Sequence, residues 1–243
     1  MPAIKNRSYP LSLALLEKYK EAALENADEL LAEARLLLHH KSHARAYFLG
    51  VASIEEIGKA VISHDALGRN ISDSAVATRL RINFEDHSQK VTSAFIPWLL
   101  ATPDLREQVM SYVNTMIDVK NGREPSMYVD VLQDGSDVVR PKTIVSLDAA
   151  TNCVSLVVAV RLHARHYIAN SPAKVRNKAE DELFAMKQTT FLKMTNTADF
   201  WEYYMARMRA GDMAFEIAAT TYHEVYFAKS KPFLTPSPAP DDA

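Results

Sequence analysis

The sequence predicts an all-α protein, a helical bundle built on a long antiparallel helix hairpin with additional C-terminal helices. Three observations lead to this fold class. The 243 residues are 48% hydrophobic and include only 6 glycines, a composition that favours packed helices over a strand-rich sandwich. Leucines recur at helical spacing over residues 13–40. A polar break at residues 41–43 separates that stretch from a second apolar one, and so short a link predicts antiparallel packing of the two helices.

The first elements follow from capping residues. The first helix of the hairpin begins at Ser12 and the second ends at Gly68. Ser72 or Asp73 then caps a short helix, and Asn83 caps the next one, which starts one residue later.

The middle of the chain combines two helices with one irregular segment. Residues 104–121 form a helix, whereas residues 122–142 are non-helical, with an extended segment at residues 128–131 and a turn at Asp134-Gly135. Residues 143–169 return to a nearly all-apolar helix, which we expect to be central in the fold.

The C-terminal part holds further helices and a tail. Residues 172–227 predict two or three helices whose methionines and aromatic residues fill a core or a dimer surface. The proline-rich residues 230–243 are expected to be disordered. We find no repeat and no linker, so residues 1–229 are interpreted as a single helical domain.

The sequence predicts a cytoplasmic protein without a strong overall charge. There is no charged-then-apolar leader and no apolar run that we judge long enough to span a bilayer, so we expect no membrane association. Cys153 is the single cysteine, and we expect it to be a buried hydrophobic residue in a reducing compartment. The net charge of −2 gives no general attraction to nucleic acid, so an RNA contact requires a local basic patch. Residues 161–178 are one candidate, although a basic helix C-terminus is the ordinary explanation.

Residues 52–60, "ASIEEIGKA", place charges inside an apolar helix. On this helix Glu55, Glu56 and Lys59 share a narrow arc with apolar residues on both sides. The opposite arc forms a core face, composed of Tyr47, Val51, Ile54, Ile57, Gly58 and Val61. Glu55 and Lys59 are an i,i+4 pair, and Glu56 is three residues from Lys59. Two interpretations remain open here: a solvated surface salt bridge, or a polar network inside the bundle. Gly58 fits either, since it allows a neighbouring helix to approach closely.

Three short motifs, in order, resemble a known family. They are Glu55-Glu56-Ile57-Gly58-Lys59, His87-Ser88-Gln89-Lys90 and Tyr128-Val129-Asp130. Together with the alanine- and leucine-rich helix pair before them, they resemble the AbiV-type abortive-infection family of bacteria, within the HEPN group of helical domains. The resemblance covers about residues 20–190.

The resemblance implies an anti-phage protein that halts growth of the infected cell. Many HEPN relatives are metal-independent ribonucleases that work as dimers and carry an Arg-x(4–6)-His motif. Histidine suits that chemistry because its pKa is near neutral, and arginine binds phosphate bidentately. Three pairs in this chain match the spacing: Arg35 with His40, Arg81 with His87, and Arg161 with His166.

We therefore expect a homodimeric, metal-independent endoribonuclease or RNA-binding toxin without a cofactor, with a phage protein as a candidate activator. His87 would be the acid/base, and Arg81 and Lys90 the phosphate contacts. Glu55, Glu56 and Lys59 would order them. Arg161 and His166 are the second candidate pair, and Arg161 would take Glu55 or Glu56 as its partner.

Other chemistries have less support. The helices concerned contain no Glu-x-x-His pair, although two carboxylates with His87 could hold a divalent ion. No glycine loop that would cradle phosphates is present. The alternative function is a non-catalytic helical defence protein that binds a phage protein or a component of translation.

Overall fold

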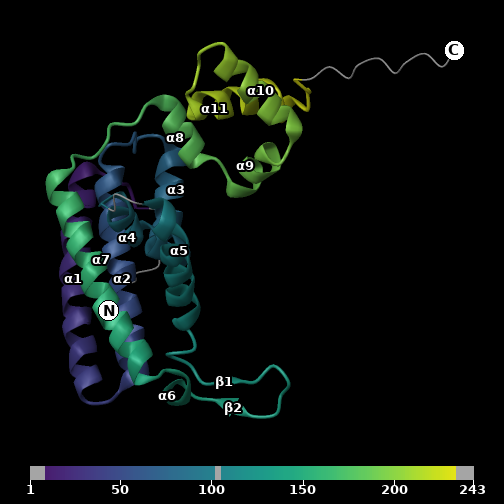
Figure 1. Cartoon of the computed structure of the whole chain (residues 1–243). Helices are drawn as coiled ribbons and strands as arrows, with labels where there is room; N and C mark the ends of the chain where they lie inside the picture. Colours follow the sequence, from purple (N-terminus) through teal and green to yellow (C-terminus); the bar gives the residue numbers. More distant parts are fainter. Residues whose placement is uncertain (1–8, 102–104, 234–243) are drawn as a thin grey trace. The chain divides into compact units, whose positions relative to one another are not determined.

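The computed structural model describes residues 9–101 and 105–233, and they are overwhelmingly helical (Figure 1). The prediction of an all-α fold built on a helix hairpin is confirmed. The elements are α1 (Leu13–His39), α2 (His43–Ala66), α3 (Ser74–Glu85), α4 (His87–Ala101), α5 (Leu105–Gly122), β1 (Asp130–Val131), β2 (Val138–Val139), α6 (Pro141–Ile144), α7 (Leu147–Asn170), α8 (Lys178–Ala185), α9 (Gln188–Thr195), α10 (Ala198–Arg209), α11 (Phe215–Val225) and the 3₁₀ helix η1 (Phe227–Lys229).

The described chain divides into two compact units. Unit 1 contains the chain up to Gly68 together with Leu80–Val175, and unit 2 contains Arg69–Arg79 and the chain from Arg176 onward. The sequence predicts one domain from residues 1–229, and neither boundary between the two units carries a linker-like composition. The predicted tail at residues 230–243 lies mostly outside the described residues.

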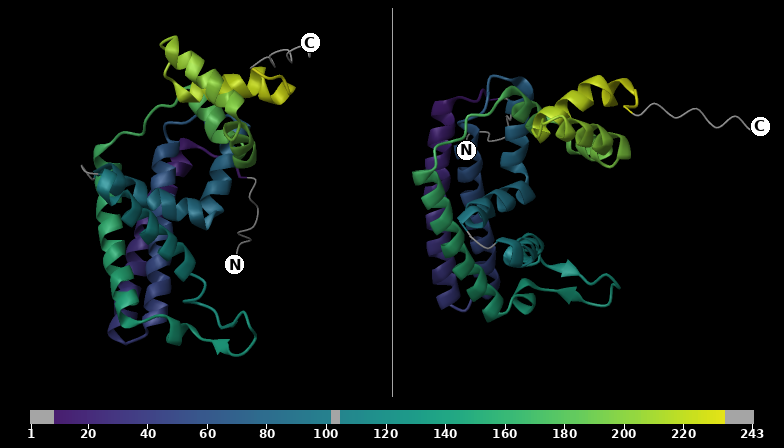
Figure 2. Two further views of the ribbon diagram at one scale, coloured as in Figure 1. Left: turned by 45° about the vertical axis from the view of Figure 1, so that its right-hand side comes forward. Right: turned by 45° about the horizontal axis from the view of Figure 1, so that its top comes forward.

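The core of unit 1 lies where α1, α2, α4 and α7 meet. Helices α1, α2 and α7 run side by side in every view (Figure 2). The predicted apolar face of α2 is confirmed, since Val51, Ile54, Ile57 and Val61 have no exposed surface. From α7, Val157, Val160 and Ala164 complete this core, so α7 has its predicted central position. Cys153 is also buried there, and burial raises the pKa of its thiol to about 12, so the thiol stays protonated at neutral pH.

Helix α7 is the one described helix long and apolar enough to cross a membrane by length and composition. This corrects the expectation that the chain has no such run. The core helix of a bundle meets the same two criteria, and α7 packs along α2 and α4 within unit 1. Of its apolar window, 33% is buried inside the protein, so its place in the core accounts for part of its composition.

A two-stranded hairpin projects from the helices of unit 1 (Figure 2). Strands β1 and β2 pair antiparallel, with Asp130 opposite Val139 and Val131 opposite Val138. Gly135 in the connecting turn has φ +69°, a left-handed conformation that glycine adopts readily. The predicted irregular segment and its turn are confirmed as far as residue 140. Pro141–Ile144 then forms the short helix α6, and the long helix predicted from residue 143 begins at Leu147.

Two further element predictions are wrong. Helix α3 continues through Asn83, and the next helix begins at His87, where Asp86 accepts a hydrogen bond from the Gln89 backbone N–H (2.9 Å). Asp86 is thus the cap in place of the predicted Asn83, although both residue types favour the capping position. Residues 172–227 contain four α-helices in place of two or three, because two of them, α8 and α9, have only 8 residues each.

Unit 2 is built on an aromatic cluster. Phe200, Tyr203 and Tyr222 are buried together with Met194, which confirms that the methionines and aromatic residues of this region form a core. Asp181 of α8 is also buried, and it accepts hydrogen bonds from Arg69 (2.8 Å) and from the Asn70 backbone (2.9 Å). The segment Arg69–Arg79 is therefore tied to α8 within this unit.

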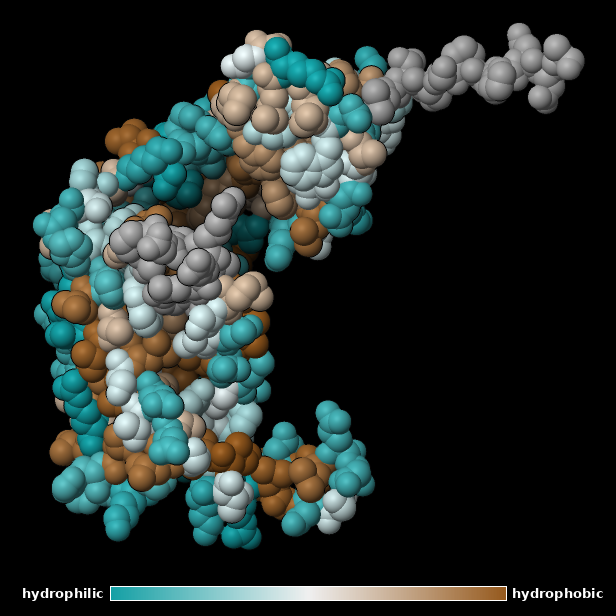
Figure 3. Space-filling model, in the orientation of Figure 1, coloured by the Kyte–Doolittle hydropathy of each residue, from teal (hydrophilic) through white to brown (hydrophobic). Residues whose placement is uncertain are grey.

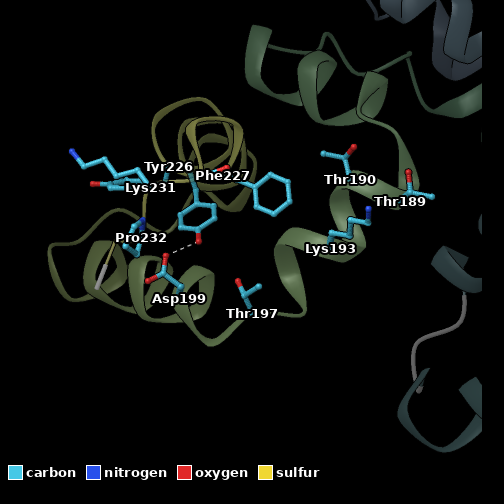
Figure 4. Close-up of a pocket in the computed structure, with 11 residues that line it drawn as sticks. Thr189, Thr190, Lys193, Thr197, Asp199, Tyr226, Phe227, Lys231 and Pro232 are labelled. Atoms are coloured by element: carbon cyan, nitrogen blue, oxygen red, sulfur yellow. Dashed lines mark hydrogen bonds between the residues drawn. The ribbon is translucent and has the colours of Figure 1, made fainter. Parts of the chain in front are cut away.

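Unit 2 also contains a cavity of about 630 Å³ (Figure 4). The carboxylate in its lining is that of Asp199, which already accepts hydrogen bonds from the Tyr222 hydroxyl (2.6 Å) and the Phe233 backbone N–H (2.8 Å). The remaining lining consists of threonines, aromatic rings and lysines, such as Thr197, Tyr226 and Lys193, together with Ser230 and Pro232. Asp199 therefore stabilises the fold of unit 2 at this cavity.

Candidate functional site

The site is centred on Glu55, a carboxylate buried in the middle of α2. The side chain is only 7% exposed, although it lies outside the apolar core face of the helix. Its Oε2 atom accepts hydrogen bonds from Lys90 Nζ (2.8 Å) and His87 Nδ1 (2.9 Å). Its Oε1 atom lies 2.8 Å from Arg123 Nε in an ion pair. A single buried carboxylate therefore holds three basic side chains from two other segments of the chain.

The start of α4 delivers two of these groups. His87 is the first residue of the helix and Lys90 follows three residues later, so both project from the same face toward α2. The two side chains also contact each other, with 3.3 Å between Lys90 Nζ and His87 Nδ1. The predicted His-x-x-Lys motif is thus brought to the Glu-Glu-Ile-Gly-Lys motif.

Gly58 makes this approach of α4 to α2 geometrically feasible. A Cβ atom at this position would overlap the backbone carbonyl of Lys90, including its oxygen, carbon and Cα atoms. The two helix backbones are therefore in direct contact one turn after Glu55. Gly58 and Glu55 therefore contribute to the same contact between α2 and α4: the glycine allows the backbones to approach, and this approach brings Lys90 within hydrogen-bond distance of Glu55.

Arg123, the third partner, was not a candidate in the sequence. It follows α5 directly, and its neighbour Gly122 lies against the Tyr47 hydroxyl on α2, where a Cβ would overlap the tyrosine ring. The guanidinium carbon of Arg123 also lies 5.7 Å from the centroid of the Phe48 ring. No periodic pattern marks a residue in a turn, so sequence reasoning had no signal for Arg123.

The electrostatic environment keeps Glu55 ionised. Burial raises the pKa of the Glu55 carboxyl, but hydrogen bonds from Lys90 and His87 and their charges outweigh it, so the pKa is lowered. Nδ1 of His87 lies 2.9 Å from the Glu55 carboxylate, which can only accept, and 3.3 Å from the Lys90 ammonium, which can only donate. The shorter contact is the one to Glu55, so we assign the hydrogen to Nδ1. The second ring nitrogen, Nε2, is then left without a proton in neutral His87.

The four groups differ in exposure. The His87 side chain is 55% exposed, whereas that of Lys90 is 6% exposed and that of Arg123 is 23% exposed. His87 is thus the group that a molecule in solution can reach, while Lys90 is held inside.

The lowered pKa of Glu55 predicts an acid-dependent loss of stability. A carboxyl whose folded pKa lies below its unfolded value of about 4.5 stabilises the fold above that value. The contribution is lost as the pH falls through the folded pKa. We therefore expect the difference in free energy of unfolding between wild type and Glu55→Gln to shrink as the pH falls below about 4.5. Urea denaturation of both proteins between pH 7 and pH 3 measures it, and a difference that does not change over this range would contradict the assignment.

The other members of the predicted network pair differently from expectation. Lys59 pairs with Glu56 and not with Glu55, and both side chains are largely screened from solvent, at 20% and 16% exposure. The surface salt bridge considered in the sequence analysis is therefore wrong for Glu55, which is buried. Glu56 and Lys59 form a separate pair next to the site.

The two predicted Arg–His pairs have other contacts. Arg81 donates to the Tyr9 carbonyl oxygen (2.7 Å), and no contact between Arg81 and His87 is present in the described residues. Arg161 and Arg165 both bind Asp28 of α1, with 2.9 Å from Arg161 Nη2 and 2.6 Å from Arg165 Nη2.

Asp28 is thus the partner of Arg161, which corrects the expectation of Glu55 or Glu56. The Arg161 hydrogen bond to Asp28 lowers the pKa of this carboxyl, so the pair stays charged at neutral pH. His166 is exposed and contacts Asn170, with 3.1 Å between Nδ1 and the amide nitrogen.

A metal site has no support in the donor set. Within residues 9–101 and 105–233, no group of three or more His, Cys, Asp and Glu side chains could hold a metal ion. Around Glu55 the space beside the carboxylate is taken by the Lys90 ammonium and the Arg123 guanidinium, which already balance its charge.

Comparisons with known proteins point to one family. The model of the HEPN_AbiV family, described as AbiV, matches residues 15–161, which is more than half of the chain. The match includes α1, α2, α4, Arg123 and most of α7, and therefore all four groups of the site. No curated protein and no solved structure matches the chain.

Proposed function

Because the chain belongs to the AbiV family of HEPN-type abortive-infection defence proteins, we propose that it cleaves RNA at His87 without a metal ion. The observation that carries this proposal is an exposed imidazole anchored through Nδ1 to a buried, ionised carboxylate. A histidine held in this way presents Nε2 in a fixed direction, as a general base requires.

The cleavage is an internal transfer on the ribose. Nε2 of neutral His87 takes the proton of a 2′-hydroxyl, and the oxygen attacks the adjacent phosphorus. The bond from phosphorus to the 5′ oxygen breaks, and that oxygen receives a proton from the imidazolium. The products are a 2′,3′-cyclic phosphate and a 5′-hydroxyl, and no water, oxidant or metal is consumed. Glu55 stabilises the imidazolium formed on the way.

The phosphate contact falls to Arg123 in this proposal. Its guanidinium is partly exposed and contacts the same carboxylate as His87, so a positive charge lies beside the imidazole. Lys90 is a positioning residue, because its ammonium is buried against Glu55 and cannot reach a phosphate. A role for Arg81, Arg161 or His166 in binding RNA stays a prediction from the sequence. None of the three contacts His87 in the part of the chain that the structure describes.

We further propose that the protein acts as a cytoplasmic homodimer, with a phage protein as its activator. Exposed apolar side chains gather on the hairpin and the segment after it, where Figure 3 shows a hydrophobic surface. They are Val129, Val131, Leu132, Val138, Ile144 and Leu147. A group of exposed apolar side chains of this kind is typical of protein interfaces.

We expect His87→Ala to lower the rate of RNA cleavage at least about 100-fold, because general acid–base catalysis contributes that much or more. The assay incubates purified full-length protein with total RNA in the presence of EDTA. Products ending in a 2′,3′-cyclic phosphate would identify the reaction. The matched control is His40→Ala, which removes an exposed histidine at the end of α1.

Two outcomes contradict the nuclease proposal. RNA that stays intact with wild type, or equal cleavage by wild type and His87→Ala, would exclude His87 as the catalytic residue. If His87→Ala also stays toxic in cells, the alternative is favoured, in which the protein acts by binding a phage protein or a component of translation.

A further inference from the structure

A second cavity, in unit 1, is lined by three segments of the chain, two of which contribute basic side chains. Its volume is about 370 Å³, within the range of small-ligand sites, which is about 300–1,000 Å³. Five of its nine lining residues are basic, and none is acidic: Lys41, His43, Arg45, Arg140 and Lys142. The remaining members are Ser42, Ala44, Val129 and Pro141. In a chain with a net charge of −2, this is a local concentration of positive charge.

These basic side chains are not neutralised by carboxylates. Among the described residues, none of the five forms an ion pair, whereas Arg161, Arg165 and Arg123 each bind a buried or half-buried acid. Of the lining residues, Arg45, Arg140 and Lys142 are exposed to solvent. The fold thus holds like charges together without an internal partner, and an anion in the cavity would relieve their repulsion.

The local backbone adds to this positive field. Lys41 has φ +58°, and this left-handed residue turns the chain from α1 into α2. Ser42, the N-cap of α2, makes no side-chain hydrogen bond to the first turn of that 24-residue helix. The positive end of the α2 dipole therefore points toward the basic side chains without a capping oxygen.

The cavity and the Glu55 site lie along one helix. Arg45 precedes Glu55 by ten residues, which corresponds to about 15 Å along α2. Phe48 lies on the same face as Arg45, one turn later, and its ring contacts the Arg123 guanidinium of the site. Arg45 therefore lies at one end of the stretch of α2 from residue 45 to residue 55, and Arg123 lies against its other end, at Glu55.

We propose that this cavity binds phosphate groups of the RNA strand whose cleavage we assign to His87, one or more nucleotides away from the scissile bond. This inference rests on the proposed function, because it assigns a second contact to the same substrate. The ligand is a phosphodiester backbone, because Arg45 and Arg140 provide guanidinium groups that match phosphate oxygens. Of the lining side chains, only Ser42 and His43 could accept a hydrogen bond from a base, so the lining is poorly suited to reading sequence. The contact would hold the strand without reading its sequence.

The test measures RNA binding, not cleavage, in the full chain. A fluorescent single-stranded RNA is titrated against the protein in the His87→Ala background, which keeps the strand intact, and the double variant Arg45→Gln/Arg140→Gln is added to that background. We expect the double variant to bind at least about tenfold more weakly. Its slope of log affinity against log salt should be shallower by about 1.4, because each single-strand phosphate contact contributes about 0.7.

The matched control is Lys18→Gln/Arg209→Gln, which removes the same charge from exposed positions on α1 and α10. This control should bind RNA with the same affinity as its parent. Thermal unfolding of the control and of the test variant checks that both proteins fold. Equal affinity and salt slope for the test variant and its parent would overturn the inference. Binding of polyglutamate as tight as that of RNA would also overturn it, and so would displacement of the RNA by inorganic phosphate at the same micromolar concentration as the RNA.

The two proposals fail separately. If His87→Ala abolishes cleavage while the charge variant binds like its parent, the nuclease proposal stands and the cavity contact is wrong. If wild type never cleaves RNA but binds it through Arg45 and Arg140, the cavity contact stands and the catalytic role of His87 is wrong.

Discussion

Replacing Glu55 with glutamine is expected to lower the free energy of unfolding by about 3–5 kcal/mol at pH 7. The substitution keeps the shape of the side chain but removes its charge. It leaves the ammonium of Lys90, which is 6% exposed, buried beside a neutral amide that cannot balance it. Arg123 and His87 lose the same partner. Urea denaturation followed by circular dichroism measures the effect.

The adjacent residue provides the control for this prediction. Glu56→Gln removes a single i,i+3 pair with Lys59, whose side chain is 20% exposed and so keeps more access to solvent than that of Lys90, at 6%; we therefore expect a loss of no more than about 1 kcal/mol. Equal losses for the two variants would mean that Glu55 is no more buried or engaged than its neighbour.

Gly58→Ala is expected to destabilise the protein by at least about 3 kcal/mol, although alanine is the better helix former by about 1 kcal/mol. The added methyl group would meet the backbone of Lys90, which cannot rotate away as a side chain can. Helix α4 would have to move away from α2, and His87 and Lys90 would move with it. Chemical denaturation measures the stability, and the loss of RNA cleavage would accompany it.

Gly50→Ala in the same helix is the matched comparison. Its Cβ would lie 2.9 Å from the Cys153 sulfur, a side-chain atom, so a small adjustment of that side chain relieves most of the contact. We expect a smaller loss than for Gly58→Ala. A stable Gly58→Ala protein with unchanged cleavage would contradict the role of this glycine in positioning α4.

Much of this fold could be predicted because its signals are local. The apolar face of α2 follows from a 3.6-residue period, and Val51, Ile54, Ile57 and Val61 are all buried as expected. The start of α4 could not be placed as well, because Asn83 and Asp86 are both good caps and only the packing of His87 and Lys90 against α2 decides between them.

The site was predictable where its residues lie on helices and not where they lie in turns. Glu55, His87 and Lys90 were all candidates, but their arrangement as one cluster depends on the contact between α2 and α4. Arg123 lies outside any periodic element and was missed. The partner of Arg161 was also wrong, because Asp28 lies on α1, far away in the sequence, and helical spacing carries no information on partners across helices.

The measurement that tests the account most directly is the tautomeric state of His87 by nitrogen-15 NMR. The ring signals of His87 in histidine-labelled protein are assigned by their absence from His87→Ala. We predict that, in the neutral form, the proton resides on Nδ1, because ionised Glu55 accepts its hydrogen bond. In Glu55→Gln this preference should be lost. A neutral His87 with its proton on Nε2 in the wild type would show that Glu55 does not hold the imidazole, and the proposed base would then be absent.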